Sequence, residues 1–301
     1  MEAPVSNSKI NAKRKLSPIY VDDYEQMDTT AQIKRRGGKK IAFGWYGGKF
    51  SHLSWLLPLL PDARCYVEPY AGSAAVLLNR RPALVETYND IDGDVCTFFR
   101  VLRERPNDLV CALSLTPFSR EEFLLAVEGS TRGISDLERA RRFFIRARQA
   151  RTGLAQTATL GRWANCKNTS RAGMSGVISR WLGGIDGLQE IAERLLRVQI
   201  ENRPALDVID LYDGPDTLFY VDPPYVHETR TDSSAYGFEM DDAQHAELAH
   251  ALNSIDGRAA VSGYRCEQMD EWYKEWRRFD APIKHCHASK AERQECLWMN
   301  Y

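Results

Sequence analysis

The sequence has little that would mark an exported or membrane-bound protein. Among its 301 residues, no apolar run approaches the roughly 18 residues that a membrane span needs, and the best one, residues 55–60, is broken by Pro58. The N-terminus has no apolar region typical of a secretory signal, so we expect no export. The seven cysteines are scattered and include no Cys-x-x-Cys pair. This pattern argues against a disulfide framework or structural zinc and for a reducing, cytoplasmic setting.

A large net charge is also missing, since the formal net charge is −1. The 40 Lys and Arg residues almost balance the 41 Asp and Glu residues, which by itself argues against a nucleic-acid partner. The distribution is uneven, however, because residues 139–180 hold ten Lys and Arg and no Asp or Glu. A solvated helix face usually carries interspersed acids, so this segment predicts a phosphate-contacting surface. The candidate DNA contacts are Arg141, Arg142, Arg146, Arg148, Arg151, Arg162, Lys167 and Arg171.

Residues 1–40 form another basic segment, with nine Lys and Arg and few apolar residues at any fixed period. We expect a disordered, solvated tail, and a DNA-touching arm or a localisation signal is the alternative.

From about residue 41 onward, predicted strands and helices alternate. The strands are expected at residues 65–67, 83–87, 217–221 and 259–261. Such alternation indicates an α/β fold with a mostly parallel sheet and helices on both faces. Ser119 and Ser135, each followed three residues later by Glu, have the capping-box spacing that starts a helix. Helices are expected at residues 74–79, 95–103, 137–149, 241–252 and 268–276.

The most specific motif is Asp222-Pro223-Pro224-Tyr225, at the carboxyl end of the predicted strand 217–221. Ligands bind at the carboxyl ends of strands in open α/β sheets. Prolines fix the backbone and supply no N–H, which leaves the Asp222 carboxylate and the Pro223 carbonyl as rigid acceptors. Two acceptors suit an exocyclic amino group, and the Tyr225 ring can stack on a heterocycle beside it.

Three other segments fit a nucleoside site. Residues 68–75 lie between a strand and a helix and contain only Gly72, so they are not the Gly-x-Gly-x-x-Gly turn of a dinucleotide site. Asp90, after the next strand, can accept hydrogen bonds from ribose hydroxyls. Residues 44–49, Gly-Trp-Tyr-Gly-Gly-Lys, add two aromatic rings and the cation of Lys49.

Together these motifs resemble the DNA adenine methylase (Dam) family of S-adenosylmethionine-dependent methyltransferases, with the α-group order of motifs, over about residues 41–301. The family's Trp-x-Gly-Gly-Lys, Glu-Pro-Phe-x-Gly, Asp-Ile-Asn-x-Asp and Asp-Pro-Pro-Tyr correspond to residues 45–49, 68–72, 90–94 and 222–225. Departures from the family pattern are Ala74 for a second glycine, Asp92 for Asn, and Gly263 where Asn is usual.

The resemblance implies a Rossmann-like methyltransferase domain, residues 41–105 and 205–301, and an inserted, mainly helical, basic target-recognition domain, residues 106–204. It implies site-specific methyl transfer from S-adenosylmethionine to N6 of adenine in double-stranded DNA, by base flipping and direct in-line transfer. The implied catalytic residues are Asp222, Pro223 and Tyr225. The implied cofactor site consists of Trp45, Lys49, Glu68, Gly72, Asp90 and Asp222.

No metal is expected to take part. His285-Cys286-His287 alternates along a predicted strand, which points Cys286 away from both histidines, and no fourth ligand is evident. Double-stranded DNA is the expected partner of a monomer or weak dimer, with no membrane. The resemblance further implies a prokaryotic or phage origin and makes a cognate restriction endonuclease a candidate partner. The recognition region does not resemble the family's GATC-reading region, so no target sequence is assigned.

Two other functions remain open. N4 of cytosine, an RNA base or a protein glutamine presents the same amino group. The glutamine enzymes favour Asn at the position of Asp222 and lack a basic insert, which counts against them. A non-catalytic DNA-binding relic of the fold is the other alternative, and the intact Lys49, Asp90 and Asp222 argue against decay.

Overall fold

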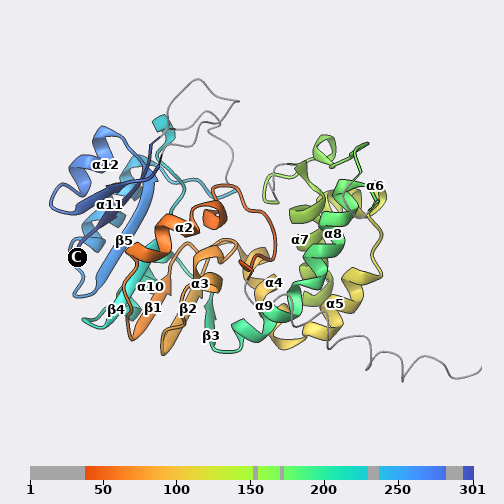
Figure 1. The fold of residues 1–301 in the computed structure, drawn as a ribbon, viewed down its shortest axis with the longest axis horizontal. Helices are drawn as coiled ribbons and strands as arrows, with labels where there is room; N and C mark the ends of the chain where they lie inside the picture. The colour runs from red at the N-terminus through yellow and green to blue at the C-terminus, as the bar shows by residue number, and fades with distance from the viewer. Residues whose placement is uncertain (1–37, 152–154, 170–172, 230–236, 283–293) are drawn as a thin grey trace, which may run out of the picture. The chain divides into compact units, whose positions relative to one another are not determined.

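A seven-stranded sheet lies at the centre of the protein, in the order β3-β2-β1-β4-β5-β7-β6 (Figure 1). The computed structural model describes residues 38–151, 155–169, 173–229, 237–282 and 294–301. The predicted 1–40 tail lies outside these ranges except for its last three residues.

The sheet is mostly parallel, as the sequence predicts. β1 to β5 pair in parallel, and β7 runs antiparallel to both of its neighbours, β5 and β6. Three of these strands, β3, β6 and β7, are not among the predicted ones. The strands are β1 (Cys65–Glu68), β2 (Val85–Asn89), β3 (Val198–Glu201), β4 (Thr217–Val221), β5 (Arg258–Tyr264), β6 (Arg277–Asp280) and β7 (Glu295–Met299).

Helices cover both faces of the sheet, and none in the described ranges is long and apolar enough to cross a membrane. All five predicted helices are confirmed within a few residues of their expected ends, although the last one ends at Trp272. The helices are α2 (Leu53–Leu56), α3 (Ala75–Asn79), α4 (Gly93–Glu104), α5 (Pro106–Ser114), α6 (Arg120–Glu128), α7 (Asp136–Gln149), α8 (Gly176–Asp186), α9 (Leu188–Leu195), α10 (Ala205–Tyr212), α11 (Asp242–Leu252) and α12 (Glu267–Trp272).

The strands are apolar on both faces because each face has its own helical cover. Along β4, Leu218 and Tyr220 enter one hydrophobic core, whereas Phe219 and Val221 enter the other. The first core includes residues of α2, α3 and α4, and the second includes residues of α10, α11 and α12. This layering, together with the strand order, confirms the predicted Rossmann-like arrangement.

The region between β2 and β3 is mainly helical. Figure 1 shows α5 to α8 gathered beside α4, beyond the edge of the sheet. As predicted, Ser119 and Ser135 cap α6 and α7, since each side chain accepts a hydrogen bond from the backbone N–H three residues on. Phe143 and Phe144 of α7 share the first core with the sheet, and β3 is the edge strand. The boundaries of a separate domain at 106–204 therefore stay a prediction.

A buried ion pair joins β2 to α9. Arg194 donates from Nη1 to Glu86 Oε2 at 2.6 Å and from Nη2 to Glu86 Oε1 at 2.7 Å, and both side chains are buried. Arg197 Nε lies 3.8 Å from the same carboxylate, but its side chain is 49% exposed. A buried charge has lost its hydration, so Glu86 depends on Arg194 far more than on Arg197.

We expect Arg194→Met to lower the free energy of unfolding by about 3–5 kcal/mol, because it leaves a buried carboxylate without its main partner. The matched control Arg197→Met removes a solvent-screened partner and should cost less than about 1 kcal/mol. Urea denaturation of both variants measures the difference, and equal losses would contradict the assignment.

Candidate active site

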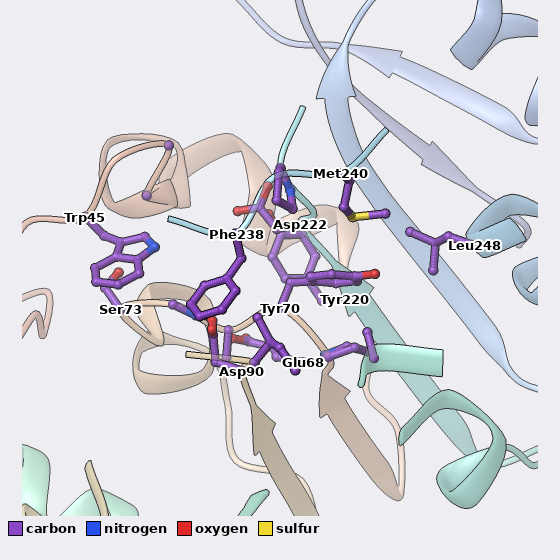
Figure 2. A pocket seen from close by; sticks show the side chains of 18 of the residues that line it. Trp45, Glu68, Tyr70, Ser73, Asp90, Tyr220, Asp222, Phe238, Met240 and Leu248 are labelled. Carbon is purple, nitrogen blue, oxygen red and sulfur yellow. The ribbon is translucent and has the colours of Figure 1, made fainter. Parts of the chain in front are cut away.

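A cavity of about 350 Å³ opens at the carboxyl ends of β1, β2 and β4. This volume lies in the range of small-molecule sites. Figure 2 shows Trp45, Tyr70, Phe238 and Met240 among the side chains around it, so much of the lining is apolar or aromatic. Among its polar side chains are three acids at the ends of these strands, Glu68, Asp90 and Asp222.

Asp90 ties the turn after β1 to the turn after β2. Its Oδ2 accepts a hydrogen bond from the N–H of Gly72 at 2.9 Å, and its Oδ1 accepts one from the N–H of Asp92 at 2.9 Å. The hydroxyl of Tyr88 donates to the carbonyl of Gly72 at 2.9 Å. Each carboxylate oxygen keeps a second lone pair, so Asp90 can still accept from a ligand hydroxyl.

The two acids beside this turn hold their protons more tightly than usual. Burial raises the pKa of Asp90 to about 6, and the N–H groups of Asp92 and Gly72 hold that pKa below what burial alone would give. Burial raises the pKa of Glu68 to about 8, although the Tyr66 hydroxyl, which donates to its Oε1 at 2.6 Å, opposes the shift. At neutral pH Asp90 is therefore mostly ionised and Glu68 is mostly neutral.

A charged cluster forms one wall of the site. Lys49, in a 3-10 turn at Lys49–Ser51, is buried, and its Nζ lies 2.7 Å from Asp222 Oδ1 and 3.7 Å from Glu295 Oε1. The hydroxyl of Tyr225 donates to Glu295 Oε1 at 2.5 Å, and Lys49 Nζ lies 4.9 Å from the centre of the Tyr225 ring. The cluster thus places one cation between two carboxylates.

Burial sets the protonation of Asp222 first of all. It raises the pKa of this carboxyl to about 6, Lys49 lowers that pKa, and Glu295 raises it. For Lys49, burial opposes the charge, but the two carboxylates outweigh burial and raise its pKa. Lys49 is therefore a cation throughout the neutral range, and Asp222 is mostly an anion above about pH 6.

The predicted site residues do not all face the cavity. Trp45, Lys49, Glu68, Gly72, Asp90 and Asp222 line it. Pro223 and Tyr225 are buried and do not line it, whereas Pro224 does. The Tyr225 ring, 5% exposed, packs edge-on against Tyr264 with ring centres 4.8 Å apart. The stacking of Tyr225 on a heterocycle stays a prediction.

Much of the basic charge on α7 has partners inside the protein. Arg141 pairs with Glu122 and Glu138, each at 2.7 Å, and Arg142 also pairs with Glu138 at 2.7 Å. Asp94, at the start of α4, likewise holds Arg139 and Arg146. The acids absent from residues 139–180 are therefore supplied by neighbouring segments, which the local charge pattern does not reveal.

The rest of the basic segment is arranged differently. The Cζ atom of Arg148 lies 5.7 Å from the centre of the Phe144 ring. Burial, and to a smaller extent the charge of Arg180, lowers the pKa of Arg148 to about 10. Arg151 and Lys167 are exposed, and Arg162 is half-buried. Arg171 lies outside the described residues. DNA contact by the eight predicted cations stays a prediction, and the exposed ones are now its best candidates.

Several polar residues at the site are not among the predicted ones, and Glu295 and Gln156 have the most specific contacts. Glu295 begins β7, a strand absent from the prediction, and a charged residue before the buried run Cys296–Met299 is the sequence feature that could have identified it. Gln156 lines the cavity, donates to Asp92 Oδ2 at 2.8 Å, and accepts from the N–H of Gly237 at 3.1 Å. We found no sequence pattern that singles out Gln156.

Comparison with known proteins fits this geometry. The profile of the D12 class N6 adenine-specific DNA methyltransferases matches residues 45–288. The chain belongs to this family. It is also 27% identical, over 122 residues, to a DNA N-6-adenine-methyltransferase of Escherichia phage P1; the match covers 39% of this chain and 16% of the relative. The chain thus corresponds to a small part of that relative's length.

Two of the departures from the Dam family pattern have structural consequences. Ala74, which precedes α3, has φ +56°, a left-handed conformation that glycine adopts without strain. At Gly263, an added Cβ would lie 2.9 Å from Met269 Cε and 3.3 Å from Trp298 Cζ3, so Asn would not fit without movement. A larger residue at this position would require the flexible end of Met269 to move and Trp298 to shift slightly.

The cavity of this D12 family member fits a cationic nucleoside cofactor. The acids Asp90, Asp222, Glu239 and Glu247 that line it outnumber the basic residues Lys49 and Arg203, and its aromatic side chains suit a base. Within the described ranges, no group of three His, Cys, Asp or Glu side chains is placed to hold a metal. His285, Cys286 and His287 lie outside those ranges, so the expectation of no metal stays a prediction.

Trp45 lies so close to the turn after β1 that position 72 of this turn requires a glycine. Gly72 has φ +49°, and a Cβ there would lie 2.6 Å from Trp45 Nε1. We expect Gly72→Ala to displace the Trp45 indole and lower the free energy of unfolding by about 1–3 kcal/mol. Tryptophan fluorescence and urea denaturation measure the two effects.

Gly44→Ala is the matched control, since no atom lies within 4 Å of a Cβ at that position and its φ is not positive. This variant should change stability by less than about 0.5 kcal/mol. A Gly72→Ala protein as stable as Gly44→Ala would contradict the assignment.

Proposed function

We propose that this protein transfers a methyl group from S-adenosylmethionine to the N6 amino group of adenine in double-stranded DNA. The observation that carries the proposal is the placement of Asp222, which lines the cavity next to Lys49 and follows the strand β4. Membership of the D12 family supports adenine as the base and DNA as the substrate.

The cofactor proposal rests on the lining of the cavity. S-adenosylmethionine supplies a methyl group bonded to a positively charged sulfur. We propose that the acidic character of the site favours this charge, and that the free lone pairs of Asp90 accept the ribose hydroxyls. Trp45 and Tyr70 line the same cavity and provide flat surfaces for the adenosyl group.

The proposed role of Asp222 is to accept a hydrogen bond from the adenine amino group, not to remove its proton. The lone pair of an adenine amino group is delocalised into the ring, and its N–H is too weak an acid for a carboxylate to remove. By accepting a hydrogen bond from that N–H, Asp222 stabilises the positive charge that develops on the nitrogen during transfer. The Pro223 carbonyl is the second proposed acceptor. The proton leaves after transfer, when the nitrogen is strongly acidic, and passes to solvent.

The target amino group lies inside the base stack of a duplex, so the reaction needs a flipped base. The Tyr225 ring is packed by Tyr264 and Lys49. Tyr225 can therefore stack on the flipped adenine only if one face of its own ring becomes exposed. An N4-cytosine substrate presents the same amino group, and methylated-base analysis of the product distinguishes the two.

We expect Asp222→Asn to reduce kcat by about 100-fold or more, because the transition state loses a charged acceptor. In the wild-type protein, kcat/KM should fall as the pH drops through about 6, since a proton on Asp222 removes the negative charge of the acceptor and the pKa of this carboxyl is raised to about 6. Transfer of a radiolabelled methyl group to unmethylated duplex DNA measures both. Unchanged transfer by Asp222→Asn would exclude the catalytic role.

DNA binding is proposed to involve the exposed cations of the basic segment. We expect the double variant Arg151→Gln/Lys167→Gln to reduce the slope of log K against log salt by as much as about 2, because each phosphate contact contributes about 0.9. Fluorescence anisotropy with non-cognate duplex DNA measures the slope. Lys274→Gln, on an exposed residue outside the segment, is the control and should leave it unchanged. An unaltered slope in the double variant would remove these two residues from the interface.

A further inference from the structure

Glu295 lies at the site because β7 runs against the parallel strands. In the β5–β7 register, Tyr264, the last residue of β5, is opposite Glu295, the first residue of β7. The amino end of an antiparallel strand meets the carboxyl ends of its neighbours, which is the edge where ligands bind. Glu295 is 9% exposed, whereas the next four residues of β7 belong to the two hydrophobic cores.

The contacts of Glu295 are specific. Its Oε1 accepts the hydroxyl hydrogen of Tyr225 and lies 3.7 Å from Lys49 Nζ. Both partners belong to the wall that contains Asp222. Lys49 pairs with Asp222, and Tyr225 is the last residue of the motif that Asp222 begins. The hydroxyl of Tyr225 is buried and needs an acceptor, which Glu295 supplies.

A carboxylate is a costly way to meet that need. A buried charge is destabilising unless it is paired, and the amide of a glutamine would also accept a hydrogen bond from Tyr225. What a carboxylate adds is a second negative charge near Lys49. The ammonium group is therefore shared between Asp222 and Glu295, instead of neutralising Asp222 alone.

We propose that Glu295 is a positioning residue for methyl transfer: it fixes the Tyr225 ring through its hydroxyl and shares Lys49 with Asp222. This inference rests on the proposed function. Because Lys49 also interacts with Glu295, it compensates the charge of ionised Asp222 less fully, and Asp222 can better stabilise the positive charge that develops on the substrate amine.

Several groups act on Asp222 from the elements around it. Lys49 faces it from the 3-10 turn, Glu295 from β7, and Tyr225 from its own loop. Tyr220 of β4 and Glu68 of β1 interact with it as well, and Tyr264 of β5 interacts with Lys49. Burial raises the pKa of Asp222 most, Lys49 lowers it, and Glu295 raises it. Loss of the Lys49 charge should therefore raise the pKa of Asp222, and loss of the Glu295 charge should lower it.

The experiment compares the pH dependence of kcat/KM in wild type, Glu295→Gln and Lys49→Met. Glu295→Gln keeps an acceptor for Tyr225 but loses the charge, so the acid limb should move to lower pH by about one unit. Lys49→Met should move it to higher pH. Glu275→Gln makes the same chemical change on an exposed residue of the described chain and should leave the acid limb in place. A purely structural role of Glu295 would not shift the acid limb.

The hydrogen bond to Tyr225 is tested separately. Glu295→Ala leaves the Tyr225 hydroxyl without its acceptor, and we expect kcat at pH 8 to fall at least about tenfold below that of Glu295→Gln. In a Tyr225→Phe background the difference between Ala and Gln at 295 should disappear. A difference of the same size in that background would overturn the positioning of Tyr225.

A measurement without turnover separates this inference from the proposed function. Carbon-13 NMR of labelled aspartate follows the titration of Asp222, with the resonance identified by its loss in Asp222→Asn. A lower midpoint in Glu295→Gln supports the sharing of Lys49 even if no methyl transfer is found, in which case only the proposed function fails. The same midpoint in both proteins overturns the inference.

Discussion

The parallel pairing of β1 with β2 and β4 is the constraint on which the site depends. It brings the carboxyl ends of three strands to one edge, so that Glu68, Asp90 and Asp222 line a common cavity although they are far apart in the sequence. The strands themselves are covered by helices on both faces, which leaves this edge as the place where polar groups can gather. The antiparallel β7 adds Glu295 to the same edge.

Acidic side chains that lie close together repel one another, and only a few cations near this site reduce the repulsion. Lys49 stands between Asp222 and Glu295, and Asp90 is stabilised by backbone N–H groups instead of a cation. Glu68 keeps its proton over most of the neutral range because burial raises its pKa to about 8. The result is a site with an excess of negative charge that a cationic ligand would relieve, a property of the whole arrangement and not of one residue.

The sequence identifies the parts of the site that are local and leaves out those that depend on distant segments. Three of the four motifs, at residues 68–72, 90–94 and 222–225, each combine a strand end with their own polar groups, as at Asp222. Glu295 could not be assigned, because its place in the site follows from pairing with β5 across the sheet. The local charge pattern likewise does not reveal the acidic partners of α7, since the partner of Arg146 is Asp94, 52 residues earlier in the chain. Short strands such as β6, with the charged sequence Arg-Arg-Phe-Asp, lack the apolar pattern that predicts a strand.

The place of β7 between β5 and β6 affects how the protein is made. The ribosome synthesises β6 before β7. Because β6 pairs only with β7, it cannot join the sheet until β7 has paired with β5. The growing chain therefore exposes the edge of β5 until its last described segment has emerged, and an open edge invites pairing with other chains. Lys49, made early, stays without its second carboxylate over the same interval. The wall that holds Asp222 can thus be completed only after synthesis has passed residue 295.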